Sequence, residues 1–183
     1  MTIGVLRVGN AGTTILSRIK DGLARVFPET KALIVDDHLP LPEAAFDKRR
    51  GQYRSNQVLG MIQSHVSNKS LNRLLGVIDA DVYIQGLNFV FGEAIFPGKA
   101  ALISLWRLRP EFYKCPSNLE VFSERSVKEA VHEVGHTLGL GHCSRSSCVM
   151  HFSNSIFDTD KKQALFCDEC YIQAALAINA LGE

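Results

Sequence analysis

The sequence predicts an α/β fold with a mixed, twisted β-sheet in one compact domain. Three observations indicate this class. A strand, helix, strand unit opens the chain, three more apolar strand candidates follow it, and helical patterns fill the remainder. At 183 residues and 46% hydrophobic content, the chain can fill one core without disulfides.

The opening unit consists of two short β-branched runs, 3–8 and 31–37, on either side of a helical stretch. The spacing of the apolar residues in that stretch is typical of one buried helix face. These residues are Ile15, Leu16, Ile19, Leu23, Val26 and Phe27.

Pro40 and Pro42 open an irregular charged stretch, and the region 38–54 around them is the only plausible linker. Apolar periodicity then predicts a second helix near 58–66. Three strands are expected at 76–84, 88–95 and 100–108, separated by Gly, Asn and Pro. This order of elements favours a mixed sheet.

A long helix is predicted over 123–140 and a terminal helix over 170–181. Ser126 and Glu129 have the spacing of a capping box at the start of the long helix, and Gly139 with Gly141 should end it. We expect a single domain, 1–183, in which 1–141 holds the sheet and this helix and 142–183 forms the C-terminal part.

The charges nearly cancel: 20 Lys and Arg oppose 19 Asp and Glu, for a formal charge of +1. This balance argues against nucleic acid or an anionic membrane as partner. The chain opens without a basic, apolar leader, and no apolar run approaches the roughly 18 residues of a membrane span. We expect a cytoplasmic monomer in a reducing compartment, where the five cysteines are metal ligands or core thiols rather than disulfides.

Residues 132–142, HEVGHTLGLGH, indicate a first metal site. His132 and His136, four residues apart on a helix, project from one face, and Glu133 can reach a water molecule at the metal. Gly139 can adopt a left-handed conformation that turns the chain back, so that His142 becomes the third ligand. Three protein ligands with one open position are typical of catalytic zinc.

The alternatives are a chance motif and a different metal. A bare HExxH occurs by chance in many helices, but the added glycine and third histidine make the pattern much more specific. Zinc is favoured for three imidazoles, while iron, cobalt and nickel can also occupy such a site.

Two cysteine pairs indicate a second site. Cys143 and Cys148 have four residues between them, and Cys167 and Cys170 have two. Four thiolates make a closed, structural zinc site that would clip the C-terminal helix to the loop carrying His142. The rivals are two disulfides, an iron–sulfur cluster or four free thiols. Cys115 is read as an unligated thiol.

His142 and Cys143 are neighbours in the chain, so they would belong to different metals. In an extended segment successive side chains point to opposite sides. His142 can therefore face a cleft while Cys143 faces away, and the structural site would support the catalytic ligand.

The set HEVGHTLGLGHC, CVM and CDEC resembles the archaemetzincins, a metzincin-clan family with a cysteine cluster after the extended zinc motif. The resemblance implies a metzincin-like domain with the active-site helix below the sheet and two zinc ions per chain. It implies His132, His136 and His142 as catalytic ligands, Glu133 as general base, the four cysteines as the structural site and Met150 as the support beneath the metal. The segment 88–95 would lie near the edge strand that aligns a peptide substrate.

The leading hypothesis is therefore zinc-dependent hydrolysis of short or flexible peptides. An aminopeptidase would need an acidic group for the substrate's α-amine, and Glu93 is the candidate. The alternatives are a zinc-stabilised binding domain with a weakly occupied or inactive histidine site, and a zinc-buffering protein.

Overall fold

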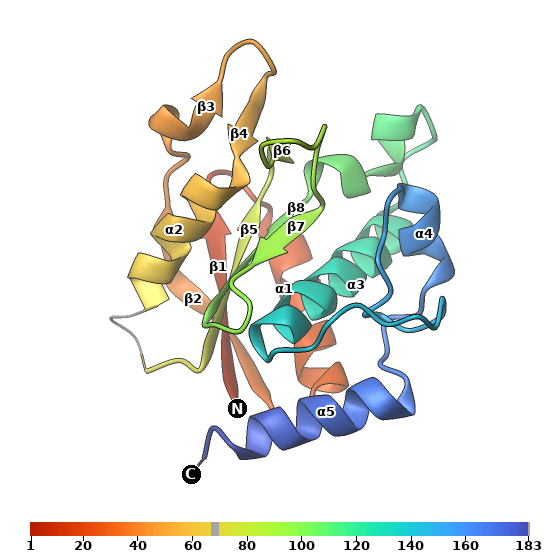
Figure 1. Cartoon of the computed structure of the whole chain (residues 1–183). Coiled ribbons are helices and arrows are strands. Elements are labelled where there is room, and N and C mark those ends of the chain that lie inside the picture. Colours follow the sequence, from red (N-terminus) through yellow and green to blue (C-terminus); the bar gives the residue numbers. More distant parts are fainter. Residues whose placement is uncertain (67–69, 183) are drawn as a thin grey trace.

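A five-stranded sheet forms the centre of the computed structural model, which describes residues 1–66 and 70–182 (Figure 1). Its strand order is β2 (Lys31–Leu39), β1 (Thr2–Val8), β5 (Arg73–Ile78), β8 (Ala100–Ser104) and β7 (Gly92–Ala94). The first four strands are parallel, and β7 pairs antiparallel with β8 at the edge. The predicted mixed sheet of an α/β fold is thus confirmed.

Helices cover both faces of this sheet (Figure 1). Helices α1 (Thr13–Val26) and α3 (Leu119–Thr137) pack on one face, where they bury alternate residues of β1, β5 and β8. Helix α2 (Ser55–Val66) packs on the other face against the intervening residues. The two-residue alternation of the strands therefore fills two separate cores.

The first two predicted strands, 3–8 and 31–37, are each slightly longer in the structure, whereas the three later ones are interrupted or shortened. The predicted strand 76–84 is two strands, β5, which begins three residues earlier, and β6 (Val82–Tyr83), separated by a break at Asp79 and Asp81. These aspartates bind Arg109 and Arg107 instead of continuing a ladder. Only Gly92–Ala94 of the predicted strand 88–95 is regular, and the third run turns at Trp106–Leu108 into a 3₁₀ helix (η2). A second 3₁₀ helix, η3, spans Pro110–Tyr113.

The stretch 38–54 is not a linker. It contains the 3₁₀ helix η1 (Glu43–Ala45) and strands β3 (Phe46–Asp47) and β4 (Gln52–Arg54). These strands form a second sheet, in the order β3-β4-β6. Ala45 and Gln52 are buried, so this segment packs onto the main domain rather than joining two domains.

Helix α3 begins four residues before its predicted start. The side chain of Asn118 accepts hydrogen bonds from the backbone N–H groups of Glu120 and Val121, both at 3.1 Å. The expected capping box is wrong: Ser126 lies inside the helix and donates to the carbonyl of Phe122. At the other end Gly139 has φ of +88°, which confirms the left-handed turn.

Two shorter helices complete the chain, α4 (Ile156–Lys161) and α5 (Asp168–Asn179). Cys170, Ala174 and Ile178 of α5 are buried against the α1 and α3 side of the sheet. Within the part of the chain that the structure describes, none of the helices is both long enough and apolar enough to cross a bilayer.

The true cap of α3 gives a first prediction. Asn118→Ala should lower the free energy of unfolding by about 1 kcal/mol, because two backbone N–H groups lose their acceptor. Ser126→Ala should leave it nearly unchanged, since alanine favours the helix interior. Urea denaturation of both variants measures the difference. Equal losses, or a loss from Ser126→Ala alone, would contradict this assignment of the cap.

Candidate metal centres

Three imidazoles converge where α3 ends. His132 and His136 lie one turn apart on α3, and His142 returns from the loop after Gly139. One ligand atom of each lies within 4.8 Å of the others, and the Nε2 atoms of His132 and His136 are 3.0 Å apart. Two nitrogens on one tetrahedral zinc at 2.0–2.1 Å would be roughly 3.3 Å apart, so this group fits a single ion.

Backbone carbonyls fix how two of these rings present their nitrogens. Nδ1 of His132 lies 2.8 Å from the carbonyl oxygen of Val149, and Nδ1 of His136 lies 2.7 Å from that of Leu140. Because a carbonyl can only accept, each Nδ1 must carry the proton, which leaves Nε2 with a free lone pair. Both histidines are therefore held in the tautomer that binds a metal through Nε2.

The surroundings also keep the imidazoles neutral. Burial lowers the pKa of His132 well below its ordinary value, and the charge of Lys162 lowers it further. Burial is also the main cause that lowers the pKa values of His136 and His142. Neutral imidazole is the form that donates to a metal.

Glu133 is buried beside the histidines and reaches the edge strand. A Cβ on Gly92 of β7 would lie 2.5 Å from Cγ and 2.6 Å from Oε1 of Glu133, so only glycine leaves room for this side chain. Burial raises the pKa of Glu133 well above its ordinary value; the charges of Glu129 and Glu93 add to the rise, and Lys162 opposes it.

Met150 packs against α3 next to the histidine group. Its side chain is fully buried. A Cβ on Gly135, between His132 and His136, would lie 2.5 Å from the Met150 sulfur. The sulfur therefore packs directly on the backbone of α3 between the two histidines, and Gly135 makes this approach possible.

Four sulfurs form the second group. The ligand atoms of Cys143, Cys148, Cys167 and Cys170 all lie within 4.8 Å of one another, and the sulfurs of Cys143 and Cys167 are 3.8 Å apart. Sulfurs on one tetrahedral zinc at 2.3 Å would be about 3.8 Å apart. None of the five cysteines, including exposed Cys115, forms a disulfide, so the disulfide alternative is not what the structure contains.

The thiols differ in their surroundings. Burial raises the pKa values of Cys148 and Cys170, whereas a backbone N–H donated by Cys170 lowers the pKa of Cys167. Two buried thiolates need a nearby cation, because burial without one favours the neutral thiol. The donor set therefore suits a metal that binds thiolate, such as zinc.

The two groups meet at the bond between His142 and Cys143. The backbone N–H of Cys143 donates to the carbonyl of Met150 at 2.9 Å, and Nδ1 of His151 lies 2.9 Å from the carbonyl oxygen of Cys143. The N–H and the carbonyl of Cys143 thereby both bind the turn around Met150, and they hold the loop that presents His142 in place.

A buried ion pair behind the histidines was missed in the sequence. Nζ of Lys162 lies 3.0 Å from Oε1 of Glu129, which also accepts a hydrogen bond from Thr159. Lys162 donates in addition to the carbonyl of His151 at 3.3 Å. Glu129 lies one turn before Glu133 on α3, and this spacing could have indicated that Glu129 lies near the histidine group. Lys162 sits in an ordinary polar stretch, and nothing in the sequence marks it.

The three histidines and Glu133 open onto a cleft of about 480 Å³. Its lining comes from the segment 84–94, here called the wall, from α3, and from Phe152, Ser153 and Asn154. Among the described residues that line the cleft there are three carboxylates, from Glu93, Glu129 and Glu133, and no Lys or Arg. Oε2 of Glu93 is buried, and no described residue hydrogen-bonds to it.

Comparison with known proteins finds one matching family and several similar proteins. The family model described as peptidase family M54 matches residues 10–175. The archaemetzincin of Methanocaldococcus jannaschii is 43% identical over 93% of this chain and 90% of its own length. That of Saccharolobus solfataricus is 46% identical over 75% of this chain and 74% of its own.

Solved structures agree with these sequence matches. The archaemetzincin of Methanopyrus kandleri has a TM-score of 0.85 and 34% identity, and the match covers 98% of this chain and 96% of that one. The archaemetzincin of Archaeoglobus fulgidus, solved with malonate, has a TM-score of 0.81 and 35% identity over 94% of this chain and 99% of that one.

The buried ion pair gives a prediction about stability. Lys162→Met should lower the free energy of unfolding by about 3–5 kcal/mol, because it leaves the Glu129 carboxylate buried without a cation. Adding Glu129→Gln should recover part of the loss. Lys161→Met, at the exposed neighbouring lysine, is the matched control and should change stability by less than about 0.5 kcal/mol. Similar losses in both lysine variants would rule out this role for Lys162.

Proposed function

The chain belongs to peptidase family M54 and is a zinc metallopeptidase, and from this we propose that Glu133 is the general base with which it hydrolyses peptide bonds. His132, His136 and His142 would hold the catalytic zinc. The observation that carries the proposal is the placement of one buried carboxylate directly beside three convergent, neutral imidazoles at the base of a cleft.

The proposed chemistry divides between the ion and the protein. A zinc ion in this position polarises a carbonyl and lowers the pKa of water to about 7. Glu133 then accepts the proton of the attacking water and delivers it to the leaving amine. Gly92 supports this role because it leaves the space that the Glu133 side chain occupies against β7.

We propose that a second zinc binds the four cysteines and is structural. Four thiolates would fill a tetrahedral ion, which leaves no position for substrate or water. Cys143 and Cys148 lie in the loop after α3, while Cys167 and Cys170 lie at the start of α5. Such a site would tie α5 to the loop that presents His142.

The cleft suits short or flexible peptides of apolar character. Its wall carries Leu87, Phe89, Val90 and Phe91, and Phe152 adds a further aromatic ring to the lining. Its three carboxylates, without a lining Lys or Arg among the described residues, should disfavour acidic side chains and a C-terminal carboxylate. The cytoplasmic location and monomeric state expected from the sequence stay predictions.

Glu93 supports an aminopeptidase mode as a second candidate. Its buried Oε2 has no hydrogen-bond partner in the described residues, and a carboxylate in the cleft could bind a substrate's α-ammonium group. The competing hypothesis, a binding domain with an inactive histidine site, predicts instead that no peptide is cleaved.

The test is digestion of a peptide library by zinc-loaded protein. Glu133→Gln should lower kcat/KM by about 10²–10⁴-fold while the zinc content stays unchanged, because only proton transfer is removed. Glu120→Gln, at an exposed carboxylate on the same helix, is the matched control.

Peptides with free and with N-acetylated N-termini test whether the enzyme acts as an aminopeptidase. Cleavage of free peptides but not of N-acetylated ones would assign the aminopeptidase mode. Cleavage by wild type and Glu133→Gln at the same rate, or by neither protein, would contradict the assignment of Glu133.

A further inference from the structure

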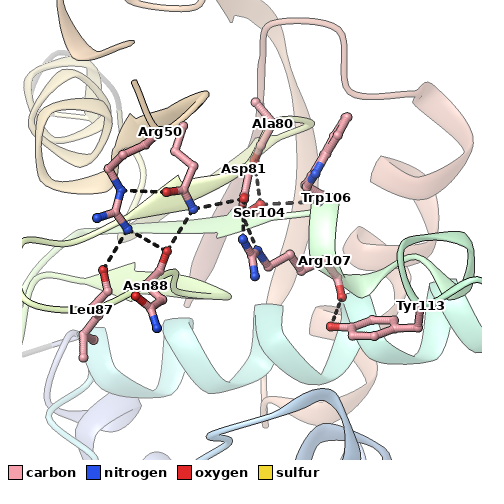
Figure 2. Close-up of polar contacts among 10 residues, drawn as sticks. Arg50, Ala80, Asp81, Leu87, Asn88, Ser104, Trp106, Arg107 and Tyr113 are labelled. Carbon is pink, nitrogen blue, oxygen red and sulfur yellow. Dashed lines mark hydrogen bonds and ion pairs between the residues drawn. The ribbon is translucent and has the colours of Figure 1, made fainter. Parts of the chain in front are cut away.

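The cleft wall between β6 and β7 is irregular and yet has to be rigid. Residues 84–91 contain no regular strand, although most of them line the cleft. A loop without a ladder is a mobile element unless other contacts hold it. Figure 2 shows the side chains that hold this segment: Arg50 from the turn before β4 donates to it, and Asp81, just before β6, binds Arg107 of η2 beside it.

The register of β7 shows which backbone groups of the wall are open. The N–H of Ser104 donates to the carbonyl of Phe91 at 2.8 Å, and the N–H of Ile95 donates to that of Ala100 at 3.0 Å. Residues 91 and 95 therefore face β8, and by alternation Gly92 and Ala94 direct their backbone groups toward the open edge. An extended peptide would pair there, provided that the preceding residues keep β7 in place.

Arg50 binds the wall just before this edge. Its Nη2 donates to the carbonyls of Leu87 at 3.1 Å and Asn88 at 2.8 Å (Figure 2). Its Nε donates to the side chain of Gln52 at 2.8 Å, and Gln52 Nε2 donates in turn to the same Asn88 carbonyl at 3.0 Å. The carbonyls of Leu87 and Asn88 are thus occupied.

The pair Arg50 and Gln52, which holds the wall, is itself fixed by Asp81 and Arg107. Gln52 Nε2 also donates to Asp81 at 3.0 Å, and Asp81 accepts two hydrogen bonds from Arg107, at 2.8 and 2.7 Å. The guanidinium of Arg107 lies 4.3 Å from the ring centroid of Phe89, a residue of the wall. Asp81 thus links the two arginines: it accepts hydrogen bonds from Arg107 directly, and it is connected to Arg50 through Gln52 (Figure 2).

We propose that Arg50 is a positioning residue for peptide binding. By holding residues 87–88, Arg50 fixes the edge strand β7 in the place where a substrate backbone would pair. Because the carbonyls of Leu87 and Asn88 are bound to Arg50, the edge that is open to a peptide begins after them. The inference rests on the proposed peptidase function. Arg50 is exposed and touches neither the histidines nor Glu133 in any described contact, so it acts through the wall.

The chain supplies a matched control. Arg49 is the neighbouring residue and is also exposed, and its side chain forms no hydrogen bond or ion pair with any other described residue. Arg49→Met and Arg50→Met remove the same charge from the same turn. Arg50→Lys keeps the charge but loses the planar fork that serves two carbonyls and Gln52 together.

The experiment compares two probes on zinc-loaded protein: acetohydroxamate, which contacts the metal alone, and a tripeptide hydroxamate with apolar side chains, which also extends along the wall. Arg50→Met should weaken binding of the peptide hydroxamate by about tenfold or more. Binding of acetohydroxamate, zinc content and melting temperature should stay as in wild type. Arg50→Lys should recover only part of the loss, and Arg49→Met should match wild type.

The outcomes separate this inference from the proposed function. If the wild type binds both probes and Arg50→Met binds both as tightly as the wild type does, the positioning role of Arg50 is overturned while the peptidase proposal stands. Equal weakening of both probes would also overturn it, since Arg50 would then support the whole fold. If the wild type binds neither probe, both the proposed function and the inference fail.

Discussion

The peptide bond between His142 and Cys143 is the constraint on which the rest of the site depends. One residue completes the histidine group and the next belongs to the cysteine group, so neither set can move without the other. Hydrogen bonds from Cys143 to Met150, and from His151 to Cys143, hold this bond against the turn under α3. A structural ion at the cysteines would therefore stabilise the catalytic geometry directly.

Charge is the second constraint. Three carboxylates line the cleft, and one of them, Glu129, is bound to the buried cation Lys162. Glu133 lies against Gly92 of β7 beside the histidines, and Oε2 of Glu93 has no hydrogen-bond partner among the described residues. The arrangement lets two glutamates one helical turn apart, Glu129 and Glu133, differ in role: one is fixed by a salt bridge and the other is kept free beside the histidines.

The sequence alone predicted those features that depend on residues close together in the chain. The spacing of the histidines and cysteines, the positive φ of Gly139 and the mixed sheet all follow from periodicity and turn chemistry. Features that depend on distant partners could not be predicted. Lys162 meets Glu129, and Arg50 meets Leu87, only after folding; the end of β5 depends on arginines well downstream. The cap at Asn118 was missed because Ser126 offered a competing pattern.

Counting zinc per chain by elemental analysis tests the central claim most directly. Wild-type protein prepared with zinc should contain two ions per chain. His132→Ala combined with His136→Ala should contain one, and that variant should stay folded, because the cysteine site keeps α5 and the loop together. One ion in both proteins, or the loss of both ions from the histidine variant, would contradict two separate centres joined at His142 and Cys143.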